Sequence, residues 1–318
     1  METKLNYKRT FLIGLAFLSI CSFWQMYDNI IPLILQNTYH LGETMTGAVM
    51  ALDNVLAIFL LPVCGMLSDK VHTKLGRRMP FIVVGTILAV IFMMMLPMID
   101  NAEKARWATG GSFSNQVFFL GVLFLTLVSM GLYRSPAVAL MPDVTPNHLR
   151  SRANAVINLM GAVGGVYALI MIKVLVGKGE TPDYLPLFAS ISAVMAIAVG
   201  ILVITIRENK LREEVEKAEA ANADTIEEKA MAEGVEAAGE IEAVGDTGEA
   251  KAFEEKQQTA KTESAKDMPK DVKRSMYFML ASIFLWFTAY NAVTTAFSRY
   301  TKVVWKMEGG SFANCLMV

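Results

Sequence analysis

The sequence predicts an all-α, polytopic membrane protein with six spanning helices, a long central loop, a seventh spanning helix and the start of an eighth. Two observations carry this prediction. Of the 318 residues, 54% are hydrophobic, and they gather into seven runs with almost no charge. The acidic residues concentrate in one stretch between the sixth and seventh runs. This distribution excludes a soluble enzyme, a secreted domain and a nucleic-acid-binding protein.

Each apolar run is long enough to cross the hydrocarbon core of a bilayer, for which a helix needs about 20 residues. The first run is too long for a signal peptide and ends without a small-residue cleavage site, so we predict that it is the first helix. The runs, in order, are Phe11–Gln36, Met45–Leu67, Pro80–Ile99, Gln116–Met141, Asn154–Val176, Tyr184–Ile206 and Ser275–Phe297. Residues 311–318 have the composition of an eighth run that has only begun. We therefore expect a C-terminally truncated version of a longer protein.

Lysine and arginine residues predict the orientation, because they favour the cytoplasmic side in short loops. With the N-terminus inside, 12 of them fall in inside segments and 3 in outside segments. We predict a cytoplasmic N-terminus and a multi-pass protein of the plasma or inner membrane. Arg299, Lys302 and Lys306, which follow the seventh run, depart from this bias.

The central stretch Arg207–Arg274 holds 19 of the 30 acidic and 12 of the 29 basic residues. It has few large apolar residues and cannot bury a core, so we predict a mostly disordered cytoplasmic loop over residues 207–273. Its first part, Glu208–Ala221, is expected to extend the sixth helix as a short solvated helix. Residues 1–206 then form a six-helix transmembrane domain, and residues 274–318 begin a second one.

The most specific local pattern lies between the second and third runs, at residues 65–80. A glycine lets another helix approach closely, and an aspartate can accept charged hydrogen bonds from two adjacent arginines. A second glycine relaxes the turn, and a proline suits the first turn of the next helix. These residues are Gly65, Asp69, Gly76, Arg77, Arg78 and Pro80.

This loop resembles the signature between helices two and three of the major facilitator superfamily, and its long form resembles the sucrose/proton symporter branch and its animal solute-carrier relatives. The stretch at residues 142–155 resembles the same branch. The resemblance implies the six-helix N-terminal half of a major facilitator fold, with about five helices beyond the seventh. It also implies alternating access, with a gating loop formed by Gly65, Asp69, Gly76, Arg77, Arg78, Asp143, Arg150 and Arg152.

The sequence departs from its apparent relatives at two places in the spans. Val138 occupies an arginine position of the plant sucrose carriers, and Arg134 lies one turn earlier on the same face. Ala57 and Leu61 stand where the related sodium/melibiose symporters carry aspartates. We therefore expect a proton rather than sodium as the coupling ion, with no other cofactor and no metal.

Four charged residues fall inside the apolar runs: Lys173 lies three positions from the end of the fifth run, whereas Asp28, Asp53 and Arg134 lie farther from the run ends. Such charges cost about 2.5–3.5 kcal/mol each on insertion scales and are functional candidates by default. We predict Asp53 as the proton-coupling residue, with Asp28 second, and Arg134 as a substrate-binding residue. At about 1.5 Å per residue, Arg134 lies about 12 Å closer to the cytoplasmic ends of the helices than Asp53 does. A direct Asp53–Arg134 pair would therefore need tilted helices or a substrate bound between the two residues.

Polar and aromatic side chains in the runs are further substrate-binding candidates. Amide and hydroxyl groups next to aromatic rings suit sugars, although aromatic residues are also common in interfacial belts. The candidates are Trp24, Gln25, Asn29, Asn54, Asn158, Tyr290 and Asn291. Gly161, Gly164 and Gly165 are expected to allow close helix packing instead.

The function that we expect is secondary transport of a sugar or similar small polar solute with a proton. The expected partners are that solute and the lipid bilayer, with no nucleic acid, and the full-length protein is expected to be a monomer. Nothing in the sequence forms a catalytic constellation, so we do not expect an enzyme. The alternatives are a drug/proton antiporter of the same superfamily and a non-functional truncated fragment. A seven-helix receptor is disfavoured, because the charge bias places the N-terminus inside.

Overall fold

The computed structural model describes residues 5–71, 73, 75–109, 115–177, 182–215, 217, 270–307 and 310–317. This part of the chain is helical and contains no β-strand beyond one isolated bridge in the turn at Thr73 and Gly76. The chain divides into two compact units, one formed by Met1–Lys217 with Thr294–Val318 and the other by Ala218–Val293.

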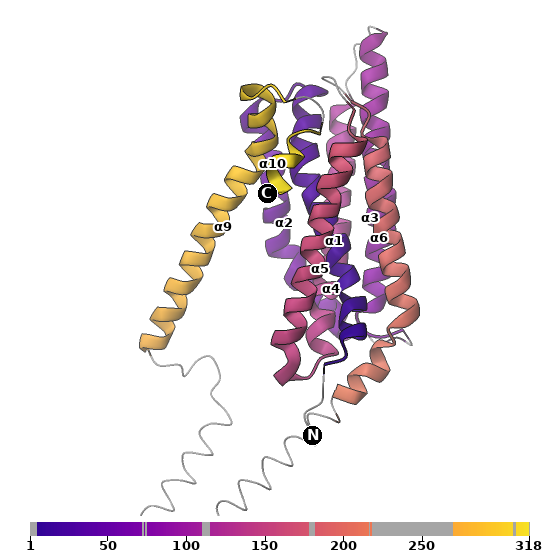
Figure 1. Cartoon of the computed structure of the whole chain (residues 1–318), viewed down its shortest axis with the longest axis vertical. Coiled ribbons are helices and arrows are strands. Elements are labelled where there is room, and N and C mark those ends of the chain that lie inside the picture. Colours follow the sequence, from indigo (N-terminus) through magenta and orange to yellow (C-terminus); the bar gives the residue numbers. More distant parts are fainter. Residues whose placement is uncertain are drawn as a thin grey trace, which may run out of the picture. The chain divides into compact units, whose positions relative to one another are not determined.

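The helices confirm all seven predicted spans, and each is long and apolar enough to cross a membrane (Figure 1). They are α1 (Tyr7–Asn37), α2 (Glu43–Lys70), α3 (Met79–Ala108), α4 (Gln116–Asp143), α5 (Arg150–Leu175), α6 (Leu185–Thr205) and α9 (Lys270–Val304). A 3₁₀ turn, η1 (Asn147–Leu149), precedes α5, and a short helix, α10 (Ala313–Met317), lies within the predicted eighth run.

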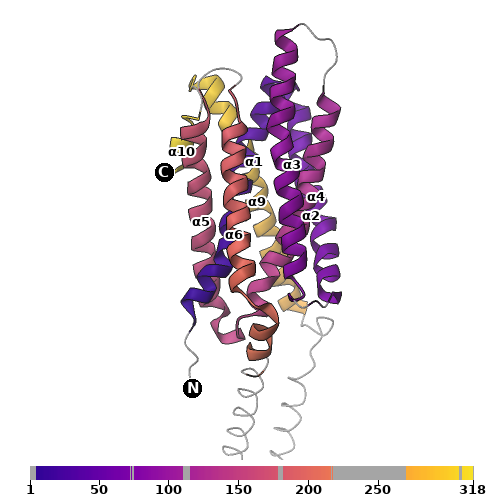
Figure 2. The same cartoon turned by 90° about the vertical axis from the view of Figure 1, so that its right-hand side faces the viewer.

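Helix α1 lies in the middle of the first unit, where it packs against α5 and α6. Helix α3 packs against α4 and α6, and α2 packs mainly against α4 (Figure 2). The outward face of α2 is apolar, with Ile58 and Phe59 more than half exposed. Such an apolar face suits a helix that borders the lipid tails. Packing this face against protein instead would give no hydrophobic gain, because lipid tails are as apolar as the side chains.

Close helix contacts in the bundle depend on glycines, as predicted for α5. A Cβ atom added to Gly164 would lie 2.1 Å from the backbone oxygen of Leu18 in α1. One added to Gly85 in α3 would lie 2.7 Å from the backbone nitrogen of Tyr133 in α4. Both positions therefore need glycine for the helix backbones to meet.

Helix α3 continues past the predicted end of its run, Ile99, through Ala108, and it projects beyond the neighbouring helices in both views (Figures 1 and 2). Its polar residues there are paired. Asp100 is fully buried and lies 2.5 Å from the Lys104 ammonium one turn later. The Glu103 carboxylate accepts a hydrogen bond from the backbone N–H of Asn115, which begins the next helix. These contacts let polar residues continue the helix beyond the apolar run.

The segment after α6 differs from the predicted solvated helix. Residues 208–215 are helical, but Glu208 is fully buried and Leu211 and Val215 are each only 7% exposed. The structure groups this segment with the six-helix bundle, whereas the predicted boundary lies at residue 206. Residues 218–269 of the predicted central loop lie outside the described residues, and its last residues, 270–273, belong to helix α9 rather than to a disordered loop.

Replacing Gly164 by alanine tests the close approach of α1 and α5. Overpacking costs about 1–3 kcal/mol, so Gly164→Ala should lower the unfolding temperature of the protein in detergent micelles. Gly200→Ala on α6 is the matched control, because nothing lies within 4 Å of the added Cβ. Equal unfolding temperatures for the two variants would contradict the packing described here.

Candidate functional site

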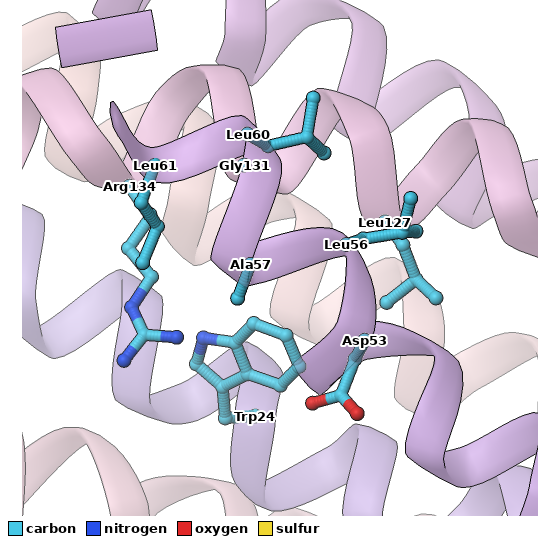
Figure 3. A pocket seen from close by; sticks show the side chains of 9 residues that line it. All are labelled: Trp24, Asp53, Leu56, Ala57, Leu60, Leu61, Leu127, Gly131 and Arg134. Atoms are coloured by element: carbon cyan, nitrogen blue, oxygen red, sulfur yellow. The ribbon is translucent and has the colours of Figure 1, made fainter. Parts of the chain in front are cut away.

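A cavity lies between α1, α2 and α4, at the level of the charged residues in the spans (Figure 3). About 280 Å³ of space not occupied by atoms, part of it open to the outside, lies within it. Only about 20 Å³ of it can hold the centre of a water-sized sphere, which is room for about one water molecule. The cavity is lined by Trp24, Asp53, Leu56, Ala57, Leu60, Leu61, Leu127, Gly131 and Arg134.

Two opposite charges flank an aromatic ring in this cavity. Figure 3 shows the indole of Trp24 between the guanidinium of Arg134 and the carboxylate of Asp53. The guanidinium carbon lies 5.4 Å from the centre of the indole ring, within range of a cation–π interaction. Among the described residues no ion pair joins Asp53 to Arg134. Both charges can therefore interact with a solute.

The aromatic residues of α1 form a ladder beside the cavity. The ring of Trp24 meets that of Phe23 at 5.3 Å and that of Tyr27 at 5.5 Å, both edge to face. The indole nitrogen of Trp24 and the hydroxyl of Tyr27 are buried, and neither has a hydrogen-bond partner in the described structure. Since buried polar atoms are normally paired, these two donors are available to a further group.

Other predicted residues of α1 and α2 take part in local contacts. The side-chain amide of Asn29 is buried and donates to the backbone oxygen of Gln25 at 2.8 Å. Gln25 is half-buried and faces Gly165 of α5, and Asp28 is half-buried one turn along α1 from Trp24. On α2, the exposed amide of Asn54 donates to the Asp53 carboxylate at 2.9 Å.

The remaining substrate-binding candidates lie on α5 and α9. Asn158 is exposed on α5. Tyr290, on the part of α9 that belongs to the second unit, is 56% exposed and stacks on Trp286 at 6.0 Å. Asn291 belongs to α9, and its side chain lies outside the described ones. Their role in binding stays a prediction.

The apolar wall of the cavity was not identified from the sequence. Leu56 and Leu60 on α2, and Leu127 and Gly131 on α4, complete the lining around Asp53. On α2 the lining residues recur at three- and four-residue intervals from Asp53, the spacing of one helix face. This periodicity could have indicated which residues of α2 share a face with Asp53. It could not show which face meets α4, because the run is apolar all round.

A second group of charges joins the loop after α2 to the end of α4. Asp69, Arg77, Arg78 and Asp143 form what we call the charge network. Arg78 lies 2.8 Å from Asp69 through Nη2 and 2.9 Å from Asp143 through Nε. Arg77 lies 2.9 Å from the same oxygen of Asp143 through Nη2, and 3.6 Å from Asp69. The loop between α2 and α3 is thereby fastened to α4.

Further hydrogen bonds orient the Arg78 guanidinium. Its Nη1 donates to the Ser68 hydroxyl at 2.5 Å and, at 3.5 Å, to the backbone oxygen of Gly65. Arg78 is only 6% exposed, so its charge is compensated by the carboxylates and these acceptors. Burial lowers the pKa of Arg77 and the hydrogen bond to Asp143 raises it, with a net rise, so this guanidinium stays charged.

The other predicted gating residues lie around the network. Gly65 packs on α4, where an added Cβ would meet the Ser135 hydroxyl at 3.5 Å. Arg150 donates to the backbone oxygens of Pro142 at 2.9 Å and Thr145 at 3.2 Å, and so stabilises the turn after α4. Arg152 is exposed at the start of α5.

Comparisons with known proteins agree with the resemblance noted in the sequence. Over 137 residues the chain is 26% identical to the rice (Oryza sativa subsp. japonica) sucrose transport protein SUT3. This match covers 41% of this chain and 27% of SUT3. Over 117 residues it is 36% identical to the Arabidopsis thaliana sucrose transport protein SUC4, covering 34% of this chain and 22% of that protein. The matched stretches thus span about a quarter of the length of these relatives.

A sequence model of the Major Facilitator Superfamily matches residues 7–317, which include all the described helices. With its apolar helices, this match identifies a multi-pass membrane protein. The chain belongs to the Major Facilitator Superfamily.

Proposed function

We propose that this chain belongs to a secondary active transporter that moves a sugar or a similar small polar solute with a proton by alternating access. The family match and the relatives named as sucrose transport proteins support transport rather than enzyme catalysis. The observation that carries the proposal is the placement of Asp53 and Arg134 on either side of Trp24 in a cavity between spanning helices.

The side chains that line this cavity suit a sugar, which would enter when the surrounding helices move apart. A pyranose or furanose ring has an apolar face that can stack on the Trp24 indole, and its hydroxyls both donate and accept hydrogen bonds. Asp53 can accept from one hydroxyl, and Arg134 can donate to others through its several N–H groups. The leucines of α2 and α4 keep the surroundings apolar, which strengthens these bonds. A drug/proton antiporter would favour a lining with fewer groups that can hydrogen-bond a solute.

The proton is proposed to bind Asp53. A carboxylate whose surroundings alternate between water and an apolar interior changes its proton affinity, and can therefore take up a proton on one side and release it on the other. The charge of Arg134 across the indole would oppose protonation. A solute that binds between the two groups would change that balance, and so couple its own movement to the proton.

The charge network is proposed to act as a gate rather than as a binding site. Its carboxylates and guanidinium groups join the loop between α2 and α3 to the end of α4, and Asp69 lies about 12 Å along α2 from the last cavity-lining residue of that helix, Leu61. Alternating access requires this end of the protein to close and open in turn. Contacts that hold one of these states affect the rate of exchange between them more than the affinity for solute.

Replacing Asp53 tests the coupling. In proteoliposomes containing the full-length protein, Asp53→Asn should abolish accumulation of radiolabelled sucrose driven by a pH gradient. Solute exchange without a gradient should survive, because the amide resembles the protonated acid. Asp183→Asn, at an exposed loop position, is the control and should accumulate solute normally. If Asp53→Asn still accumulates solute, Asp53 is not the coupling residue, and Asp28→Asn is the next variant.

Replacing Asp69 tests the gate. Asp69→Asn removes the charge that pairs with Arg78, so the maximal transport rate should fall about tenfold or more while KM stays within about twofold. Initial rates over a range of solute concentrations separate the two. A loss confined to KM would show that Asp69 contributes to solute binding and not to gating.

A further inference from the structure

The segment that follows α6 crosses the end of the bundle that carries the charge network. We call residues 207–215 the strap. Its Glu208 is fully buried, and the carboxylate accepts hydrogen bonds from three consecutive backbone N–H groups. These belong to Arg77 at 3.0 Å, Arg78 at 3.0 Å and Met79 at 3.1 Å. They are the N–H groups at the start of α3.

The start of α3 needs such an acceptor. The first N–H groups of a helix have no partner within the helix, and their partial positive charge favours an anion. The N-cap residue of α3 is Arg78, and its side chain makes no capping bond. Glu208 therefore caps the start of α3, for which the local sequence provides no capping group. It lies in the strap, 130 positions after Arg78 in the sequence.

The loop before α3 is shaped around this carboxylate. Gly76 has a φ of +129°, which side-chain-bearing residues rarely adopt. A Cβ atom added there would lie 2.1 Å from Oε2 of Glu208. Gly76 is thus required for two reasons, its backbone conformation and the space that Glu208 occupies.

Two further contacts fasten the strap. The Asn209 amide donates to the backbone oxygen of Thr73 at 3.0 Å, so a second strap residue contacts the loop between α2 and α3. Glu214 pairs with Arg9 in the first turn of α1 at 3.2 Å. The Glu214 side chain is 61% exposed, so this pair stabilises little, and the buried Glu208 is the principal attachment.

We propose that Glu208 is a positioning residue of the gate. By fixing the backbone of residues 77–79, it directs the two guanidinium groups toward Asp69 and Asp143. The first residues of the central loop are then part of the gate, and displacement of the strap loosens the charge network without touching the cavity. The effect on transport rests on the proposed function, whereas the effect on the backbone does not.

The backbone effect is tested by amide hydrogen exchange of the full-length protein, followed by mass spectrometry on peptides that cover residues 75–82. Glu208→Ala should speed exchange of the amides of Arg77, Arg78 and Met79 about tenfold or more, because hydrogen bonds to a charged acceptor are lost. Glu208→Gln, which keeps one acceptor oxygen, should have a smaller effect. Glu214→Gln, a glutamate in the same segment with an exposed side chain, should leave these amides unchanged.

The link to the gate is tested by transport rates in a double-mutant cycle. Glu208→Ala should lower the maximal rate with KM within about twofold, as Asp69→Asn does. If Glu208 acts through the charge network, adding Glu208→Ala to Asp69→Asn should lower the rate little further, since the two losses are shared. If Glu208→Ala does not fold, Gly76→Ala can replace it, because the added Cβ would push the Glu208 carboxylate away from the start of α3. This variant should then lower the maximal rate in the same way.

The outcomes are distinguishable. Unchanged amide exchange in Glu208→Ala would overturn the assignment of Glu208 as the cap of α3. Faster exchange with independent, multiplicative losses in the double variant would show a merely structural residue and overturn its role in the gate. If the wild-type protein transports no solute, the proposed function fails, and the exchange result still decides whether Glu208 holds the start of α3.

Discussion

Arg78 makes the contacts on which this end of the helix bundle depends. Its guanidinium contacts Asp69 of α2, Asp143 of α4 and the Ser68 hydroxyl, while its backbone N–H donates to Glu208. One residue thereby joins α2, α4 and the segment after α6 to the start of α3. The Arg78 and Asp143 side chains are mostly buried, so removing Asp143 would leave a buried charge without one of its partners, whereas Asp69 is half exposed and its removal costs less. The elements at this end therefore hold together or separate together.

The cavity shows the opposite use of charge. Asp53 and Arg134 lie in the same cavity but are separated by the Trp24 indole, so each retains the capacity to interact with a solute. In a spanning helix such charges are costly unless a cavity, water or a ligand compensates them. The charges of the network pair with one another, whereas no ion pair among the described residues joins the two charges of the cavity.

The spanning helices and the charged loop between α2 and α3 could be predicted from the sequence, because their signals are local. Uncharged runs define the helices, and Asp69, Arg77 and Arg78 lie within ten positions of one another. The neighbours of α2 could not be predicted, because a helix that is apolar all round does not show which face meets α4. Glu208 was missed for a related reason: its partners lie about 130 positions away, and a glutamate in an acidic stretch looks solvated.

Solute-driven proton movement tests the central claim most directly. Proteoliposomes containing the full-length protein are suspended in weakly buffered medium, and the external pH is followed after sucrose and related sugars are added without an imposed gradient. Coupled uptake predicts that the medium becomes more alkaline on addition of a transported sugar, and that Asp53→Asn abolishes this change while solute exchange continues. Sugar uptake with no change in external pH, or with the same change in Asp53→Asn, would contradict the account.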